Sequence, residues 1–236
     1  MSHVDNKESQ KFFDQLAPEY DAKRHRGFLS AAEAALDFYM RKFPSRRHEA
    51  ILEIGVGTGE AFTTFAQRYK VAVAFDISHA MVTVAKRKAT AAGQFCVASA
   101  EALPFKGRAF DAVLCMDVLE HVHSPAAAMR EIGRVLARGG MAYVTTPNPL
   151  WAPIQWTAET LKLKVPEGPH RYVFLPALAH ESVCGDTELV VHHVGFLVYA
   201  PLSRFTKPEA GWTLAQKPLF RCLGHNQLVI VGRQVP

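Results

Sequence analysis

Short apolar runs alternate with stretches of helical periodicity through the middle of this sequence, and that alternation constrains the fold more than any other feature. The apolar runs cover residues 50–54, 71–75, 94–98, 109–116 and 141–145, and the helical stretches cover residues 60–68, 79–92 and 125–137. Ser78 and the pair Ser124-Pro125 are typical first residues of helices, and Gly139-Gly140 should stop the third helix. Strands that alternate with helices form a parallel sheet through crossover connections. We therefore expect an α/β fold with helices on both faces of a mostly parallel sheet.

The regions on either side of this alternation predict additions to a single core. Apolar residues recur at three- and four-residue spacing over residues 9–43, which predicts an N-terminal helical flank. After Pro147, frequent prolines and large apolar side chains indicate an inserted cap, and residues 188–194 and 226–232 are patterned as two further strands, which makes seven. A chain of 236 residues fits one α/β domain better than two. The expected organisation is one domain, 1–236, with the flank at 1–48, the core at 49–147, the cap at 148–182 and the C-terminal strands at 183–236.

The composition is that of a folded chain. Hydrophobic residues make up 49% and charged residues 21%, which supplies enough apolar material to offset the entropy lost on ordering. The first residues are polar, and no apolar stretch of about 18 residues occurs, so we expect a cytoplasmic protein. The cysteines lie far apart without C-x-x-C spacing, and we interpret Cys96, Cys115, Cys184 and Cys222 as reduced, buried thiols, with no metal site.

The charge is mildly basic, with a net value of +5 from 27 basic and 22 acidic side chains. Basic runs occur at residues 41–47 and 86–88. Such runs are most often solvated faces, and we adopt that interpretation; the alternative is a footprint for phosphate on a nucleic acid or an anionic membrane surface. We expect no DNA partner, and the sequence leaves open whether the protein is a monomer or a homodimer.

The strongest local signal is the glycine-rich turn from Glu53 to Gly59, which ends the first strand and opens the first helix. Glycine lets the backbone pass close beneath a ligand, and a helix start offers unpaired N–H groups. The glycine spacing is G-x-G-x-G, whereas a dinucleotide fingerprint reads G-x-G-x-x-G. The carboxylate of Glu53 suits a cationic amino acid or a sulfonium group better than a pyrophosphate. The turn therefore indicates a cofactor site that differs from that of a nicotinamide oxidoreductase.

Asp76 follows the second strand and should lie beside the glycine-rich turn, because the carboxyl ends of neighbouring parallel strands share one edge of the sheet. A carboxylate there can accept hydrogen bonds from both hydroxyls of a ribose. An Asp in such a turn can also be a simple helix cap. The glycine turn next to it favours the ribose interpretation.

From these motifs onward the chain resembles the class I S-adenosylmethionine-dependent methyltransferases of the methyltransferase type 11 group, over nearly its whole length. Residues 53–59 look like the first motif of that family, Asp76 with Ser78 and Met81 like its ribose motif, and residues 100–105 like its adenine-side loop. Residues 111–122, D-A-V-L-C-M-D-V-L-E-H-V, are similar to its fourth strand and following helix. The resemblance implies a Rossmann-like fold.

Within that family the chain is most similar in appearance to the O-methyltransferases of ubiquinone biosynthesis. Three stretches carry this likeness, at residues 115–122, 145–148 and 185–201. The sequence departs from the family at Ser99, where an Asp commonly binds the adenine amino group, and at residues 137–140, A-R-G-G in place of K-P-G-G.

The resemblance implies S-adenosyl-L-methionine as cofactor, S-adenosyl-L-homocysteine as product, and no metal. The residues expected to bind the cofactor are Tyr20, Glu53, Gly55, Gly57, Gly59, Asp76, Ile77, Met81, Ser99, Ala100, Glu101, Met116 and Asp117. Tyr20 and Arg26 on the flank could fold over the carboxylate of the cofactor or close the site.

Methyl transfer from a sulfonium mainly requires that the acceptor be aligned with the methyl group and that water be excluded. A hydroxyl acceptor also benefits from a base, and imidazole titrates near neutral pH. The candidates are His121, His123 and His170, with His121 the first choice because it follows the fourth strand. Each of these histidines can equally be a wall or helix-start residue.

The predicted reaction is O-methylation of a small aromatic, polyketide-like or isoprenoid-lipid hydroxyl. The alternatives are N- or C-methylation of a small molecule, an RNA or protein methyltransferase, and a non-catalytic module that binds the cofactor. An isoelectric point near 9.1 favours RNA, but the fourth strand lacks an N-P-P-Y type motif. Trp151 and Trp156 could line a substrate pocket, touch a membrane or simply pack in the cap.

Overall fold

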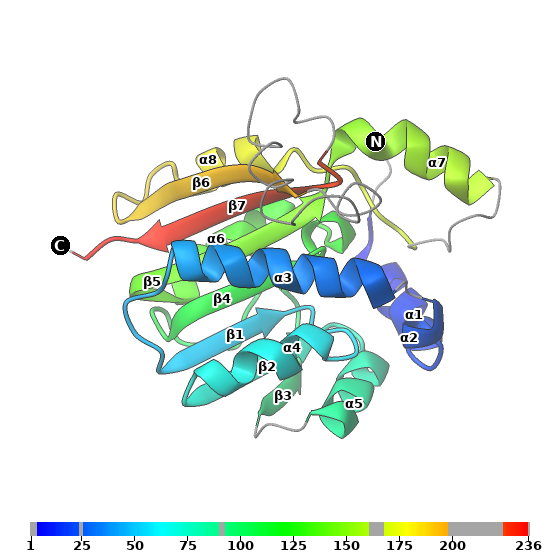
Figure 1. Ribbon diagram of the computed structural model, residues 1–236, viewed down its shortest axis with the longest axis horizontal. Coiled ribbons are helices and arrows are strands. Elements are labelled where there is room, and N and C mark those ends of the chain that lie inside the picture. The colour runs from blue at the N-terminus through cyan, green and yellow to red at the C-terminus, as the bar shows by residue number, and fades with distance from the viewer. Residues whose placement is uncertain (1–3, 24–25, 90–92, 161–167, 198–223, 236) are drawn as a thin grey trace.

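The computed structural model describes residues 4–23, 26–89, 93–160, 168–197 and 224–235 (Figure 1). Its centre is a seven-stranded sheet with the order β3-β2-β1-β4-β5-β7-β6. The strands are β1 (Ala50–Ile54), β2 (Val71–Asp76), β3 (Gln94–Val97), β4 (Phe110–Met116), β5 (Leu136–Pro147), β6 (Leu189–Leu197) and β7 (Asn226–Arg233). β1 to β5 pair in parallel, and β7 is antiparallel to both of its neighbours. The predicted mostly parallel α/β sheet is confirmed.

Helices cover both faces of this sheet. They are α1 (Asn6–Leu16), α2 (Tyr20–Lys23), α3 (Arg26–Lys42), α4 (Glu60–Phe65), α5 (His79–Lys88), α6 (Pro125–Val135), α7 (Ala152–Thr160) and α8 (Leu175–Val183), with short 3₁₀ helices η1 (Ala66–Arg68), η2 (Leu119–His121) and η3 (Pro149–Trp151). In Figure 1, α3, α4 and α5 lie in front of the sheet and α6 and α8 lie behind it, while α1 and α2 sit beyond the carboxyl ends of β1 and β4.

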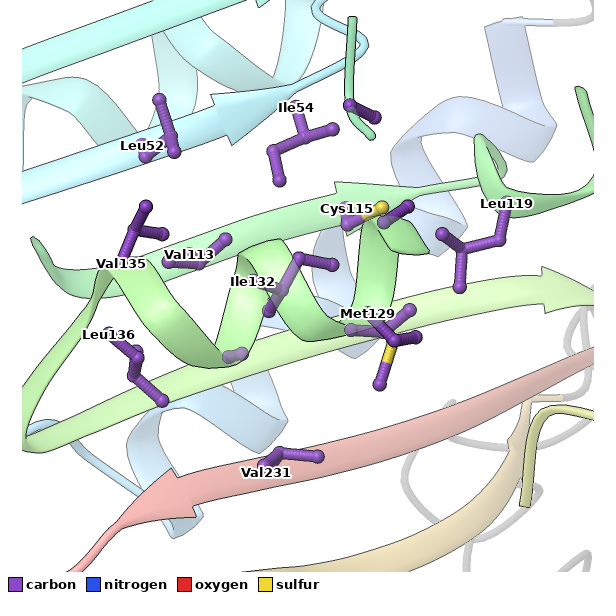
Figure 2. Packing of buried hydrophobic residues seen from close by; sticks show 14 of the residues in the cluster. Leu52, Ile54, Val113, Cys115, Leu119, Met129, Ile132, Val135, Leu136 and Val231 are labelled. Atoms are coloured by element: carbon purple, nitrogen blue, oxygen red, sulfur yellow. The ribbon is translucent and has the colours of Figure 1, made fainter. Parts of the chain in front are cut away.

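Alternation along the central strands divides the core into two layers. Leu52 and Val113 are fully buried on the face covered by α6, where Ile132 packs with them (Figure 2). Ile51 and Leu114, one residue away in each strand, are buried on the opposite face with side chains of α3 and α4. Successive strand residues point to opposite faces, so a strand buried on both faces is apolar throughout. This explains the unbroken apolar runs in the sequence.

Two helices begin where the sequence predicts. The hydroxyl of Ser78 accepts a hydrogen bond from the Met81 N–H at 3.1 Å, and the hydroxyl of Ser124 accepts one from the Ala127 N–H at 3.3 Å. A side-chain oxygen at this position satisfies one of the N–H groups that the first helical turn leaves unpaired. Both caps hold their helix starts next to the carboxyl ends of the strands.

The end of α6 differs from the prediction. The helix stops at Val135, and Gly139-Gly140 lie within β5 and do not terminate the helix. The cause is tertiary, because Leu136 already pairs with Phe110 of β4. Gly139 has a φ of +75°, and a Cβ on Gly140 would approach the carbonyl oxygen of Ala137 to 2.9 Å. The glycines therefore allow an irregular first stretch of β5.

One buried side chain forms hydrogen bonds and ion pairs that hold the last two strands to the rest of the sheet. Arg233 of β7 is 5% exposed and donates to the carbonyl oxygens of Gly133 and Leu136 at 2.7 and 3.0 Å. It also forms ion pairs with Asp186 and Glu188 at 3.1 and 2.7 Å. The guanidinium presents its donors in a rigid planar fork, so a single residue can hold four partners. It ties the start of β6 to the junction between α6 and β5.

The prediction that the cysteines are buried is only partly correct. Cys115 is buried in β4, but Cys96 on the edge strand β3 is half-buried and Cys184 after α8 is exposed, while Cys222 lies outside the described residues. An edge strand and a helix end have fewer covering neighbours than a central strand, which accounts for the difference. Among the helices that the structure describes, none is both long enough and apolar enough to cross a bilayer.

Candidate functional site

A cavity of about 560 Å³ opens at the carboxyl ends of β1, β2 and β4, next to the first residues of α4 and beneath α1 and α2. The strand order reverses between β1 and β4, because the chain runs outward from β1 through β2 to β3 and then returns to β4. Open α/β sheets bind ligands at such a reversal. The cavity reaches sideways to the ends of β5, β6 and β7, where Thr145, Leu197 and Asn226 line it.

The glycine-rich turn forms the floor of this cavity. Gly55 and Gly57 have φ values of +69° and +52°, a backbone region that glycine adopts without strain. A Cβ on Gly55 would lie 2.3 Å from Cγ2 of Val118, so the turn packs tightly there. A Cβ on Gly57 would meet no atom of the described residues within 4 Å, so that side of the turn faces the cavity. The backbone at Gly57 is thus directly accessible to a ligand.

Glu53 places a carboxyl group at the start of this turn. Its side chain is 4% exposed, and Oε2 has no hydrogen-bond partner among the described residues. Burial raises the pKa of Glu53 well above its usual value, and the charges of Glu33 and Asp76 raise it further. A buried carboxylate is stabilised when a cation approaches it. This group is therefore suited to a ligand that carries positive charge.

Asp76 closes the neighbouring side of the cavity. Its two carboxylate oxygens accept hydrogen bonds from the N–H of Gly57 and the N–H of Ser78, both at 2.9 Å. Burial raises the pKa of Asp76, and these backbone hydrogen bonds oppose that rise. The carboxylate thus connects the glycine turn to the start of α5, as the prediction of adjacent strand ends requires. An acid held in this way has a fixed orientation for hydroxyl donors.

The N-terminal helices cover the cavity through polar contacts that the sequence analysis missed. The Ser9 hydroxyl donates to the carbonyl oxygen of His121 at 2.9 Å. Asp14 accepts from the Ser78 hydroxyl at 2.6 Å, and Asp21 accepts from the Thr58 hydroxyl at 2.6 Å. Each contact joins the flank to a loop that follows a strand. The helical periodicity of residues 9–43 identified the helices, but their polar residues gave no signal of these partners.

Glu101, predicted to bind the cofactor, joins two helices beside the cavity. Its carboxylate accepts from the N–H of Ser124 at 2.5 Å and from the side chain of Asn6. It therefore links α1 to the start of α6. Ser99, which stands where the family commonly has an Asp, does line the cavity, and its hydroxyl oxygen accepts from the Glu101 N–H at 3.2 Å.

The far end of the cavity carries a group of polar side chains from three strands. Asp117 follows β4 with a φ of +53°, which is unusual for a residue with a side chain. Its Oδ1 accepts from the Thr145 hydroxyl at 3.1 Å and from the Asn226 amide at 2.6 Å. The Oδ1 of Asn226 lies 2.7 Å from Nδ1 of His225. Asp117 was predicted from the sequence, whereas Asn226 and His225 carry no motif that predicts them.

Two of the three histidines predicted as bases, His121 and His170, lie side by side but differ in access to the cavity. His121 lines it, and Nδ1 of this ring lies 2.9 Å from the carbonyl oxygen of Pro169. The ring also makes edge contacts with Phe13 and with His170, at centroid distances of 5.2 and 6.2 Å. His170 is not among the described residues that line the cavity, and its Nδ1 lies 3.0 Å from the Gly168 carbonyl oxygen. Nδ1 of the third, His123, lies 3.2 Å from the Val4 carbonyl oxygen.

Most of the residues predicted from sequence meet at this cavity. Its lining includes Tyr20, Glu53, Gly55, Gly57, Asp76, Ile77, Met81, Ser99, Ala100, Met116, Asp117 and His121. Of the described residues, Gly59, Glu101, His123 and His170 were predicted for the site but are not part of the lining. Gly59 instead takes a φ of +85° at the N-cap of α4. The side chain of Arg26 lies outside the described residues, as does the stretch Tyr199-Ala200-Pro201.

Comparison with protein families identifies the central part of the chain. A family model described as a methyltransferase domain matches residues 52–144, which begin within β1 and end within β5. Among solved structures, an S-adenosylmethionine-dependent methyltransferase from Mesorhizobium loti superposes with a TM-score of 0.61 at 17% identity, covering 86% of this chain and 100% of that one. That likeness concerns the fold.

Curated relatives extend the similarity beyond the domain model. A ubiquinone biosynthesis O-methyltransferase of Leptothrix cholodnii is 30% identical over 164 residues, which is 65% of this chain and 69% of that protein. A demethylmenaquinone methyltransferase of Thermus thermophilus is 36% identical over 141 residues, covering 56% of this chain and 62% of that protein.

Proposed function

The chain belongs to the class I S-adenosylmethionine-dependent methyltransferases, and we propose that it methylates a hydroxyl group of a small aromatic, polyketide-like or isoprenoid-lipid acceptor. The enzyme class follows from the family. The acceptor and the atom that receives the methyl group are the proposal. It is supported by the shape and polarity of one cavity.

Three residues fit the cofactor of this family. Glu53 would face the positive charge of the amino acid or sulfonium, Gly57 would let the backbone approach, and Asp76 would accept from the ribose hydroxyls. When bound, S-adenosylmethionine supplies an electrophilic methyl group on a sulfonium. The observation that carries the proposal is that one cavity contains a buried carboxyl oxygen of Glu53 and a face of Gly57 that no other described residue contacts.

The acceptor side combines an apolar wall with one polar end. Phe13, Leu197 and Leu228 line the cavity, and Asp117 and Asn226 close it. Pockets for small molecules are mostly apolar, with a few polar groups that orient the ligand. An apolar ring or chain with a hydroxyl at one end matches this arrangement. His121 also lines this part of the cavity, and we propose that it contacts the acceptor.

Methylation at carbon is the second candidate. It is favoured by the similarity to a demethylmenaquinone methyltransferase, whose identity of 36% exceeds that of the ubiquinone-type relative, although over fewer residues. An activated ring carbon next to a hydroxyl would need the same apolar wall and the same polar end. The two candidates differ in the atom that bears the new methyl group, so the product decides between them.

Contact with a membrane surface is a further part of the proposal for a lipid-like acceptor. Leu150, Ile154, Trp156 and Phe174 are exposed apolar side chains around η3, α7 and the start of α8. Apolar side chains grouped on a surface often mark a contact site. Co-sedimentation with anionic vesicles should be weakened by W156S, whereas equal sedimentation of both proteins would remove this part of the proposal.

The first test is binding of the cofactor. Calorimetry should detect uptake of S-adenosylmethionine and of S-adenosylhomocysteine by the wild-type protein, and thermal unfolding should shift upward with either ligand but not with NAD. D76N should weaken binding about tenfold, because the amide retains the shape but loses the charge that accepts from ribose. H180Q, on the exposed surface of α8, is the matched control and should bind like the wild type.

The second test is the product. Incubation with catechol, 3,4-dihydroxybenzoate and a short-chain demethylubiquinol should yield S-adenosylhomocysteine and an O-methylated product that mass spectrometry and NMR can assign. A methyl group on ring carbon would favour the second candidate. Binding of the cofactor without turnover of any hydroxyl or carbon acceptor would contradict both.

A further inference from the structure

The polar end of the cavity contains a continuous hydrogen-bonded chain that ends in an imidazole. It runs from Asp117 through the amide of Asn226 to His225, with separations of 2.6 and 2.7 Å. Asn226 is 1% exposed, and all three residues line the cavity. These hydrogen bonds connect the loop after β4 with the residue just before β7.

The chemistry of these groups determines where the protons lie. An ionised carboxylate only accepts hydrogen bonds, so Asn226 must direct its NH₂ group toward Asp117. Its carbonyl oxygen therefore points to His225 and can only accept, which makes Nδ1 of His225 the donor. The neutral ring then has its proton on Nδ1 and its basic lone pair on Nε2. The second partner of a histidine sets its tautomer in this way at many catalytic sites.

The backbone of His225 is fixed on both sides. Its N–H donates to the Leu197 carbonyl of β6 at 2.8 Å, and its carbonyl accepts from the Asn148 N–H at 2.8 Å. The Asn148 side chain, 2% exposed, holds the preceding residue through the Gly224 carbonyl at 2.7 Å. The indole of Trp151 packs on the imidazole at a centroid distance of 5.2 Å. A catalytic group needs such support to keep its geometry.

His121 is the natural comparison, because the carbonyl oxygen of Pro169 orients that ring in a similar way. The difference is that the amide next to His225 is itself bonded to a carboxylate. When an imidazole takes up a proton, a carboxylate at the far end of the hydrogen-bonded chain stabilises the new charge. The ionisable side chains that line the same cavity around His225 are Asp117, Glu120 and His121, with Glu33, Glu53, Glu60 and Asp76 on the cofactor side.

From this geometry we infer that His225 is the general base of the reaction, and that Asn226 and Asp117 are its positioning residues; the inference rests on the proposed transfer to a hydroxyl. The acceptor oxygen forms a bond to the methyl carbon while the bond from that carbon to the sulfonium sulfur breaks and its electron pair stays on sulfur. The hydroxyl proton passes to Nε2 of His225, which becomes an imidazolium and later releases the proton to water.

The first experiment measures the tautomer and needs no acceptor. In full-length protein labelled with ¹⁵N-histidine and saturated with S-adenosylhomocysteine, long-range ¹⁵N spectra should show His225 with its proton on Nδ1, assigned by its absence in H225Q. N226A should lose the preference for the proton on Nδ1, because the amide oxygen that accepts it is removed. A proton on Nε2 in the neutral ring of the wild type, or an unchanged tautomer in N226A, would overturn the inference.

The second experiment measures turnover of catechol and of 4-nitrocatechol, whose more acidic hydroxyl ionises near neutral pH without help. H225Q should lower kcat with catechol by about 100-fold or more while the Kd for S-adenosylmethionine stays within about twofold of the wild type. It should also remove the rise of kcat with pH that reports an imidazole base. With 4-nitrocatechol the deficit should shrink to a few-fold. N226A should lose part of kcat, and H180Q should match the wild type.

The outcomes separate the two claims. Normal cofactor binding together with a catechol rate in H225Q within about threefold of the wild type, and the same pH profile, would remove His225 as the base and leave the proposed function intact. An equal deficit with both catechols would assign His225 to structure and so overturn its role as base. Cofactor binding without turnover of either catechol by the wild type would contradict the hydroxyl acceptor itself, and the base with it.

Discussion

The two walls of the cavity are built on different principles. The cofactor wall, which we define as Glu53, Gly55, Gly57 and Asp76, comes from the ends of β1 and β2, two adjacent strands that are connected by a single helical crossover. The acceptor wall, defined as Asp117, Thr145, Asn226 and His225, includes partners 109 positions apart in the chain. A short motif can encode the first wall, whereas the second exists only when β7 inserts beside β5. On the proposed function, recognition of the cofactor depends on local sequence, and recognition of the acceptor depends on topology.

The largest expected effect tests whether the acceptor wall depends on one side chain. Arg233 is buried and holds β7 to its neighbours, so R233M should lower the free energy of unfolding by about 3 kcal/mol, since it removes the hydrogen bonds of a buried guanidinium to two carbonyl oxygens and its ion pairs with Asp186 and Glu188. Thermal unfolding should show a melting temperature lower by about 6–12 °C.

The control for this change is R138M. Arg138 contacts the same Glu188 at 3.1 Å but is largely solvent-exposed, and the loss of an exposed ion pair should cost no more than about 0.5 kcal/mol. If both substitutions lower the free energy of unfolding equally, burial of Arg233 has no special effect on stability. The acceptor wall would then not depend on this one side chain.

The next effect concerns the cofactor wall alone. G57A should weaken binding of S-adenosylmethionine by about 30-fold, because the new Cβ enters the open face of the turn, while the positive φ costs about 1 kcal/mol of stability. G55A should instead mainly unfold the protein, because its Cβ meets Val118 at 2.3 Å. Calorimetry and thermal unfolding on both variants separate ligand effects from folding effects. Unchanged affinity in folded G57A would mean that the ligand does not pass over this face.

A smaller effect follows from the buried carboxyl of Glu53. Because its pKa is raised in the folded state, the folded protein retains a proton that the unfolded chain releases above a pH of about 4.5. Glu53 therefore costs stability as the pH rises through that value toward the raised pKa. E53Q cannot ionise, so at neutral pH its melting temperature should be about 2–4 °C higher, with no gain in acid below the unfolded pKa.

The same substitution should weaken cofactor binding, about tenfold by calorimetry, because the carboxylate that faces a cation is lost. If E53Q is more stable but binds the cofactor more weakly, the carboxyl group of Glu53 contributes to binding and not to folding. Stabilisation without any loss of affinity would place Glu53 outside the binding wall.

The smallest effect lies away from both walls, at His193 on β6. Its ring packs against Tyr39 and Phe43 of the N-terminal flank, and its buried Nε2 has no hydrogen-bond partner in the described part of the chain. Burial and the charge of Lys42 lower the pKa of His193. As the pH falls through the unfolded value near 6.5, the unfolded chain gains a proton that the folded protein does not, so stability decreases.

H193F should therefore reduce the difference between melting temperatures measured at about pH 5 and pH 8, with little change at pH 8. The matched control is H180Q on the exposed face of α8, which should leave the pH dependence unchanged. If the two variants behave alike, the burial of His193 has no consequence for acid stability.

The strands of the fold could be predicted closely because their signal is local. The predicted run at residues 50–54 coincides with β1, and the run at 71–75 misses only Asp76 of β2. The boundary between α6 and β5 could not be found in the same way. Leu136 leaves the helix because it pairs with Phe110, and no neighbour in sequence reveals that pairing. Glycines that normally stop helices were therefore given the wrong role.

The residues of the site likewise fall into those that the local sequence predicts and those that it does not. Glu53 and Asp76 were placed together from sequence because parallel strand ends must share an edge, and both line the cavity. His225 carried no signal, since it follows residues without a regular pattern and gains its partners only through Asn226 and β6. Glu101 and His170 fitted a motif or a residue type, but their positions depend on α1 and on the segment after α7. Site residues whose partners lie on distant strands of the sheet cannot be predicted from the sequence and are found only in the structure.

The antiparallel insertion of β7 between β5 and β6 has a consequence for biosynthesis. A chain leaving the ribosome can pair β1 to β5 early, but β6 has no strand beside it in the sheet until β7 emerges. The nascent protein would thus complete the cofactor wall first, and the acceptor wall only after β7 has inserted between β5 and β6. Synthesis order would therefore follow the order of the two walls along the sequence.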